Sequence, residues 1–146
     1  MTTKASAVEP AAYALLCIGF GAILFTHGLP KALHDAHGSM ADPMASSIHL
    51  IGDVMGLPFA PQIAALVMLL ETVGAVMLAV GLFTRLLALA FVFEMAGIAC
   101  ALGPTWPWID RGIEYPIFMG LLAGYMVVRG AGDWSIDGGW MKRRAS

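Results

Sequence analysis

Four long stretches of this chain are apolar and almost free of charge. Between Glu9 and His27 no side chain is charged, residues 61–84 and 86–102 hold one charge each, and residues 115–128 hold none. As helices, such stretches approach the ~20 residues that cross about 30 Å of hydrocarbon, and the last needs a few more residues at each end. Of all residues 59% are apolar and 12% charged, against about 25% charged in soluble domains. The sequence therefore predicts an integral membrane protein.

The predicted fold is an all-α membrane protein, a four-transmembrane-helix bundle that forms a single domain over residues 1–146, since this length suits one domain. Pro30 is expected to end the first span, because its ring opposes further helix. The segments expected are spans at about 10–29, 61–82, 86–102 and 113–128, followed by a cytoplasmic tail at 129–146.

The long connection after the first span contains a predicted short amphipathic interfacial helix at about residues 43–55. Asp42 is expected to be its N-cap and Pro43 its first helical residue. Apolar residues then recur on one face at helical spacing: Met44, Ile48, Ile51 and Met55. We expect this helix to lie in the membrane interface or to cover the bundle.

The positions of Lys and Arg predict how the chain is oriented. Four spans place both termini and the turn between the second and third spans on one side, and Lys and Arg gather on the cytoplasmic side of membrane proteins. Both termini are therefore predicted to be cytoplasmic, with the tail held by membrane lipid through its tryptophans and basic residues. The terminal side holds Lys4, Arg85, Arg129, Lys142, Arg143 and Arg144, and the other side holds Lys31 and Arg111.

One carboxylate interrupts each of the second and third spans. Glu71 precedes Leu82 by as many residues as Glu94 follows Phe83, so the two lie at equal depth, roughly 14–17 Å from the cytoplasmic face at 1.5 Å per residue. Small residues share the faces of both, which is typical of close helix packing. Beside Glu71 these are Ala64, Gly74 and Ala75, and beside Glu94 they are Ala90, Gly97 and Ala101.

The sequence places no Lys, Arg or His at the depth of Glu71 and Glu94. Two unpaired carboxylates in hydrocarbon cannot both stay ionised, so we expect one or both to be protonated at neutral pH. Acids inside a membrane are candidate functional residues. We predict that this pair is catalytic, as a proton relay or as hydrogen-bond partners of a ligand such as a quinone. The alternative is an interhelical hydrogen bond that locks the bundle.

A second set of polar residues falls near the outer face, at the end of the first span and the start of the fourth. A histidine and a carboxylate there can exchange protons with a quinol headgroup or hold a metal. Alternatively they are ordinary charges at the membrane edge. The predicted ligand-binding residues are His27, Lys31, Arg111 and Glu114.

The first loop carries three more histidines, His34, His37 and His49. An H-x-x-H pair with nearby carboxylates can bind zinc or copper, but no third ligand stands in register, so we interpret these as solvated loop histidines and predict no metal site. The sequence has no axial histidine at mid-membrane depth for haem and no cysteine cluster for iron–sulfur. Any redox role therefore needs a quinone or a partner's cofactor. Nothing predicts a nucleic-acid partner.

Several short motifs follow one another along the chain. They are H-G-x-x-K after the first span, G-L-P before the second, E-x-x-G and G-L-x-T-R across the hairpin, G-x-E at the fourth span, and a closing G-x-G-x-x-S-I-D. In this order they resemble the DoxX family. The resemblance implies a small four-span protein of the bacterial inner membrane. Some members are named as subunits of quinone-linked oxidoreductases, and others are associated with oxidative-stress or thiol complexes.

These observations leave three functions open. The first is a subunit of a quinone-linked oxidoreductase or other redox membrane complex, with Glu71 and Glu94 handling protons or a ligand. The second is a non-catalytic accessory subunit that anchors a larger complex. A proton-coupled carrier ranks last, because no broken helix pair or inverted repeat is visible. Other membrane subunits or further copies of the chain are the expected partners, and whether the chain is itself an enzyme stays open.

Overall fold

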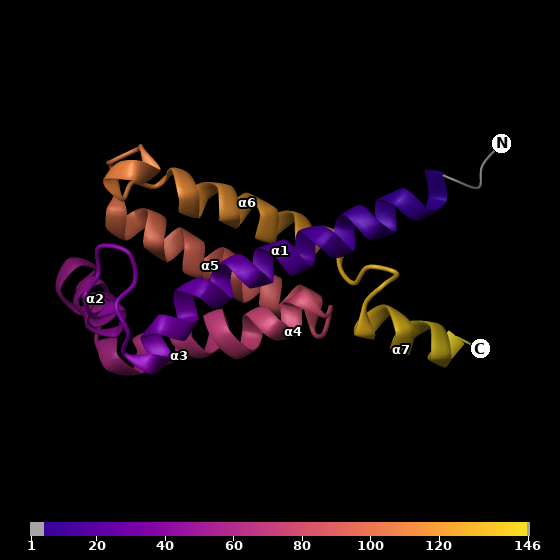
Figure 1. Cartoon of the computed structure of the whole chain (residues 1–146), viewed down its shortest axis with the longest axis horizontal. Helices are drawn as coiled ribbons and strands as arrows, with labels where there is room; N and C mark the ends of the chain where they lie inside the picture. The colour runs from indigo at the N-terminus through magenta and orange to yellow at the C-terminus, as the bar shows by residue number, and fades with distance from the viewer. Residues whose placement is uncertain (1–4, 146) are drawn as a thin grey trace.

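The computed structural model describes residues 5–145, apart from the side chains of residues 5–7, 108, 141, 142 and 145. Every regular element in this part of the chain is helical, which confirms the predicted all-α fold (Figure 1). The long segments are α1 (Ala5–Leu33), the continuous run of α3 (Ala60–Leu69), η2 (Leu70–Gly74) and α4 (Ala75–Ala79), then α5 (Thr84–Leu102) and α6 (Glu114–Arg129). The short segments are α2 (Pro43–His49) with η1 (Leu50–Val54), η3 (Trp108–Asp110) and α7 (Ile136–Ala145).

The long helices lie side by side and form a bundle (Figure 1). A tight turn joins α4 to α5, α6 runs back along α5, and α1 lies along α4 and η2. The start of α1, the α4–α5 turn and α7 lie at one end, the terminal side. The loop of residues 34–42 and α2 lie at the other, the histidine-loop side. Lys4 and the side chain of Lys142, both used to predict the orientation, lie outside the described residues.

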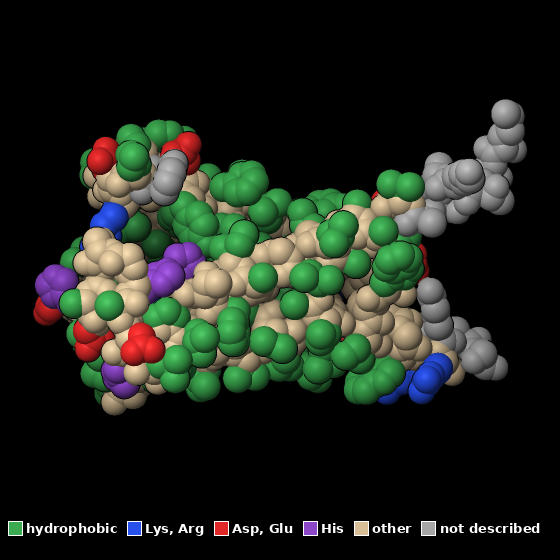
Figure 2. Space-filling model, in the orientation of Figure 1, with side chains coloured by type: hydrophobic (Ala, Val, Ile, Leu, Met, Phe, Trp, Pro, Cys, Tyr) green, Lys and Arg blue, Asp and Glu red, His purple; other side chains and the backbone are tan. Residues whose placement is uncertain are grey.

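Among the described residues, three helices are long and apolar enough to cross a membrane: Val8–Leu33, Ala60–Ala79 and Thr84–Leu102. On the face shown in Figure 2, apolar side chains are spread along the length of the molecule, charged side chains gather at its two ends, and the histidines lie at the histidine-loop side. This distribution is that of a protein whose sides face lipid. At 16 residues α6 is shorter than these three, so the fourth span stays a prediction.

The first helix continues past Pro30, so the prediction that this proline ends it is wrong. Helix α1 runs to Leu33 with Pro30 inside its last turns. A proline costs one helical hydrogen bond and disfavours helical backbone at the residue before it. Here the end of α1 packs against η2, and this tertiary contact outweighs the local preference. As a consequence Lys31 lies on the helix rather than in the following loop.

The short helix of the first connection begins as predicted. The Asp42 carboxylate accepts a hydrogen bond from the Ala45 amide at 2.9 Å, and Pro43 is the first helical residue. Its apolar face packs on α3, where Ile51 and Ala64 are buried together. The helix therefore covers the bundle. Its last turn is π-helical, closed by the Met55 amide bonding to the Leu50 carbonyl at 3.0 Å.

Two glycines let α1 approach the second long helix closely. A Cβ on Gly21 would lie 2.5 Å from the Ala75 carbonyl oxygen, and one on Gly28 would lie 2.7 Å from the backbone of Glu71. Backbones come this close in membrane bundles only where a side chain is missing. The contact at Gly28 matters most, because Lys31 follows one helical turn later and is brought beside Glu71.

The terminal side is closed by the end of the chain. The Asp137 carboxylate accepts hydrogen bonds from the Phe83 amide at 3.1 Å and the Thr84 amide at 2.9 Å, which caps the start of α5. The Tyr13 hydroxyl donates to the Gly130 carbonyl oxygen at 2.7 Å. The Asp137 cap satisfies amides that the start of a helix leaves open, and it holds the tail against the α4–α5 turn. The Tyr13 hydrogen bond holds the end of α6 against α1.

Candidate functional site

A large cavity lies between the long helices at the histidine-loop side. Its volume is about 1170 Å³. Residues of α1, η1, α3, η2, α5 and α6 line it, and most of them are apolar. Leu66 of α3 and Phe93 of α5 line the cavity although 65% and 69% of each is exposed. The cavity therefore reaches the lateral surface of the bundle, the side that faces lipid. Its size and apolar lining are typical of sites for organic ligands.

The small residues of the two hairpin helices have different roles. Ala64 and Ala75, beside Glu71, are fully buried in helix contacts, as predicted. Ala90, Gly97 and Ala101, beside Glu94, are half-buried and line the cavity. Close helix packing at these three residues stays a prediction. The two helices of the hairpin, α3–η2–α4 and α5, are close to each other at the α4–α5 turn. At the other end, α2 and η1 fill part of the space between them.

Glu71 lies in the π-helical turn η2, closed by the Ala75 amide bonding to the Leu70 carbonyl. Only 3% of the residue is exposed. Its carboxylate pairs with the Lys31 ammonium at 2.5 Å. The expectation that no basic group reaches this carboxylate is therefore wrong. The extended α1 and the flexible lysine stem bring a cation from near the helix end to the buried acid. Turns of this π-helical kind recur at functional sites.

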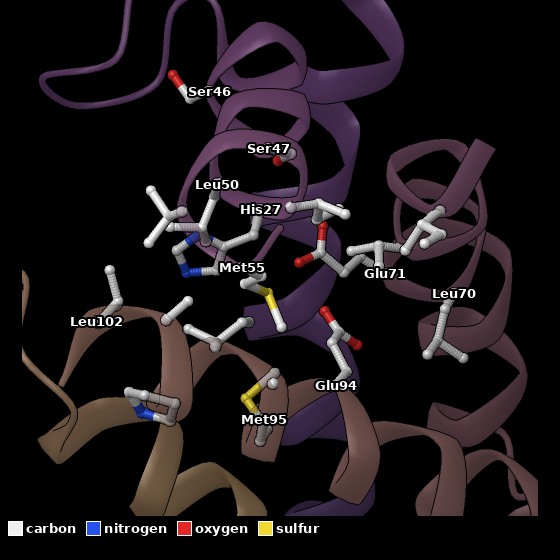
Figure 3. A pocket seen from close by; sticks show the side chains of 18 of the residues that line it. His27, Ser46, Ser47, Leu50, Met55, Leu70, Glu71, Glu94, Met95 and Leu102 are labelled. Atoms are coloured by element: carbon white, nitrogen blue, oxygen red, sulfur yellow. The ribbon is translucent and has the colours of Figure 1, made fainter. Parts of the chain in front are cut away.

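Glu94 lies on α5 with its carboxylate directed toward that of Glu71 (Figure 3). Both of its oxygens are buried, and neither has a hydrogen-bond partner among the described residues. The buried hydroxyl of Tyr115, on α6, is likewise without a partner in this part of the chain. Buried polar groups are almost always satisfied, so each exception needs an explanation. Both residues line the cavity. A shared proton can join Glu94 to the facing Glu71 carboxylate (Figure 3), and a polar group of a ligand can bond to the remaining carboxyl oxygen and to the Tyr115 hydroxyl.

The charges of the site balance only if a proton is bound. Lys31 contributes one positive charge, whereas Glu71 and Glu94 contribute two carboxyl groups in the same buried space. An uncompensated charge in such surroundings is costly. One proton on the carboxyl pair gives a neutral site, and coupled carboxyls share such a proton rather than assigning it to one residue. The arrangement can therefore hold and release a proton beside a ligand.

His27 adds an imidazole to the cavity wall. Its ring lies 5.1 Å, between centroids, from the ring of His37 and 5.7 Å from that of Tyr115. His37 is half-buried against it, so the interpretation of His37 as a solvated loop residue is wrong. His34 is exposed, as expected, and His49 makes an exposed pair with Asp53 at 2.6 Å. Among the residues that the structure describes, no group of three His, Cys, Asp or Glu side chains lies close enough together to hold a metal ion.

The predicted outer set is only partly brought together. His27, Lys31 and Arg111 all line the cavity. Arg111 is exposed, and its guanidinium lies 3.8 Å from the Met40 sulfur. Glu114 is exposed at the start of α6 and does not line the cavity. The neighbours of the His27 ring are His37 and Tyr115 instead. Sequence reasoning missed Tyr115, although its position beside the G-x-E motif was a usable signal.

Comparison with known protein families agrees with this architecture. The family model described as DoxX matches residues 12–104, a range that contains His27, Lys31, Glu71 and Glu94. The motifs at the start of α6 and in the tail lie outside the matched range. No curated protein matches the chain, and no solved structure matches it. Since the match covers more than half of the chain, this protein belongs to the DoxX family.

Proposed function

We propose that this DoxX-family protein binds a quinone in its cavity, as a subunit of a quinone-linked oxidoreductase or related redox membrane complex. The observation that carries the proposal is the buried Glu94 carboxyl, which lacks a partner and lines an apolar cavity of about 1170 Å³. A quinone joins a flat ring bearing two oxygens to a long apolar tail. The ring suits the polar end of the cavity, and the tail suits its opening beside Leu66 and Phe93 toward lipid.

The polar groups suit the headgroup in both redox states. The Lys31 ammonium and the Tyr115 hydroxyl can donate hydrogen bonds to quinone carbonyl oxygens. When a quinol is oxidised, two protons leave its hydroxyl groups and two electrons leave its ring. The carboxyl pair of Glu71 and Glu94, which already shares one proton, receives these two protons one at a time and releases the first before it takes the second. A partner subunit takes the electrons, and in the reverse direction it supplies them.

The proposed setting is the bacterial inner membrane, with four spans and both termini in the cytoplasm. Helix α6 is the proposed fourth span, because its apolar stretch lies along α5. With four spans, the order of segments along the sequence assigns six of the eight Lys and Arg residues to the side of the termini. The preference of positive residues for the cytoplasm supports a cytoplasmic location for that side. The cavity then opens toward the outer leaflet.

Native mass spectrometry of the protein released gently from its own membrane tests the ligand. The wild-type chain is expected to carry a quinone, and Glu94→Gln is expected to lose it. Glu9→Gln serves as control, because Glu9 pairs with Arg129 on the surface at the opposite end. If the wild type, Glu94→Gln and Glu9→Gln retain quinone equally, Glu94 does not contribute to quinone binding. A stoichiometric protein partner without a small molecule would favour the accessory-subunit function instead.

A further inference from the structure

Ionisable side chains form a series from the buried acids to the histidine-loop side. Glu94 faces Glu71 across the cavity, and Glu71 pairs with Lys31. His27 faces the same space from α1 (Figure 3). Its ring contacts the ring of His37, which belongs to the loop after α1. Each member of the series can hold a proton. Glu94, Glu71 and His27 line the same cavity, and the ring contact joins His27 to His37.

Backbone hydrogen bonds hold His37 over His27. The His37 amide donates to the Met40 carbonyl oxygen at 2.9 Å, and the Met40 amide donates back at 3.0 Å. Gly38, inside this turn, has a φ of +58°, a conformation that glycine adopts without strain. The residues on both sides of His37 are exposed. His37 therefore stands between the cavity and the solvent at the histidine-loop side.

The opposite direction is closed by apolar side chains. Immediately beyond Glu94, Phe20 of α1 and Phe91 of α5 meet edge to face at 5.4 Å between ring centroids. Both are buried in the same core cluster as Leu24 and Leu78. Among the buried residues of that cluster, the ionisable ones are Cys17 and Tyr13, and the Tyr13 hydroxyl already donates to a carbonyl. A proton that crossed this layer would travel as a bare charge through apolar surroundings, which is strongly unfavourable.

We infer that the Glu71–Glu94 pair exchanges protons with one side of the membrane only, the histidine-loop side, through His27 and His37. The inference rests on the proposed role of the two acids in handling protons. A proton leaving Glu94 passes to the Glu71 carboxylate, is carried by water that enters the open cavity to an unprotonated nitrogen of His27, and moves through His37 to solvent. A neutral imidazole suits this role because it accepts at one nitrogen and donates from the other.

The charged and titratable groups around His27 come from several neighbouring elements, whereas α3 and η1 contribute only apolar residues to the cavity wall. The charged and titratable groups that line the cavity are Lys31 of α1, Glu71 of η2, Glu94 of α5, Tyr115 of α6, His49 of α2 and Arg111 of the loop before α6. The positive charges of Lys31 and Arg111 disfavour protonation of the imidazole, whereas the negative charges of the carboxylates favour it. His27 is therefore suited to transient protonation, and His37 is the member of the series that reaches the exposed loop.

Proteoliposomes of known orientation test the route without any quinone. The pH outside the vesicles is stepped, and the infrared carbonyl band of the protonated Glu71–Glu94 pair is followed over time. Loss of the band in Glu94→Gln assigns it. A step on the histidine-loop side is expected to change the band promptly. A step on the terminal side is expected to act only after the vesicle interior equilibrates. His37→Gln should slow the prompt response by about 10²-fold, the low end of a positioned proton carrier's contribution.

His34→Gln is the matched control, because His34 lies in the same loop but is exposed. It is expected to respond like the wild type. Equal prompt responses from both sides would overturn the one-sided route. An unchanged rate in His37→Gln, an equal loss in His34→Gln, or a band of the carboxyl pair that never responds to pH would overturn it as well. If the protein carries no quinone but still exchanges protons with one side only, the quinone proposal fails and the proton route stands. The two proposals can therefore fail independently of each other.

Discussion

Replacing Lys31 by Met removes the only cation within ion-pair distance of Glu71 among the described residues. Methionine keeps much of the length of the lysine stem without its charge. Because 3% of Glu71 is exposed, water cannot compensate the lost partner. Breaking a buried pair from one side typically costs about 3–5 kcal/mol. We therefore expect a large loss of stability at pH 7.

The size of this loss has an upper bound, because Glu71 can bind a proton instead of staying charged. Protonating an ordinary glutamate, with a reference pKa of about 4.3, costs about 3.7 kcal/mol at pH 7, since each pH unit contributes about 1.36 kcal/mol. The folded variant then holds one proton more than the folded wild type, whose Glu71–Glu94 pair already shares one. Its stability consequently falls more steeply than that of the wild type as the pH rises, and its deficit against the wild type should nearly vanish near pH 4.

The free energies of unfolding of the wild type and Lys31→Met can be measured by reversible unfolding in mixed micelles, followed by tryptophan fluorescence at several pH values. The double variant Lys31→Met with Glu71→Gln should recover to within about 1 kcal/mol of the wild type, because replacing both partners of a buried pair is often nearly neutral. Glu9→Gln breaks an exposed pair and should change stability little. A single Lys31→Met variant as stable as the wild type at every pH would refute the buried ion pair.

Three further predictions concern packing, the ligand and the tail. Gly28→Ala places a Cβ 2.7 Å from the Glu71 backbone and should lower the unfolding midpoint, whereas Gly19→Ala, with nothing within 4 Å, should not. Tyr115→Phe should weaken quinone binding about tenfold in a nanodisc titration, the loss of one hydrogen bond of about 1.4 kcal/mol, and a wild-type affinity would remove its hydroxyl from the site. Asp137→Ala should cost about 1 kcal/mol through the lost cap of α5 and speed proteolysis of the tail; unchanged proteolysis would contradict this docking.

Local patterns predicted the parts of the fold that depend on neighbouring residues. The apolar stretches predicted the long helices, and Asp42 with Pro43 predicted the start of α2. The equal distances of Glu71 and Glu94 from the hairpin turn placed them together, and they face each other. These features follow from helical periodicity and capping, which a single sequence displays directly.

Long-range contacts decided what the sequence could not predict. Lys31 reaches Glu71 because α1 continues through Pro30 and crosses the second long helix at Gly28. Neither the crossing nor the π-helical turn that carries Glu71 has a local signature. His37 contacts His27 because a turn in the loop folds back over the bundle. The cavity itself depends on how the helices are spaced, which no periodicity of one helix determines.

Photoaffinity labelling in the native membrane with an azido-substituted quinone tests the central claim most directly. Peptide mapping then locates the labelled residues. A ligand in the cavity should label the lining face of α5 around Glu94 and Gly97, or the start of α6 at Tyr115, and competing unlabelled quinone should abolish this labelling. Labelling confined to lipid-facing residues outside the cavity, such as Leu86 and Leu121, or labelling that excess quinone leaves unchanged, would contradict a quinone site in this protein.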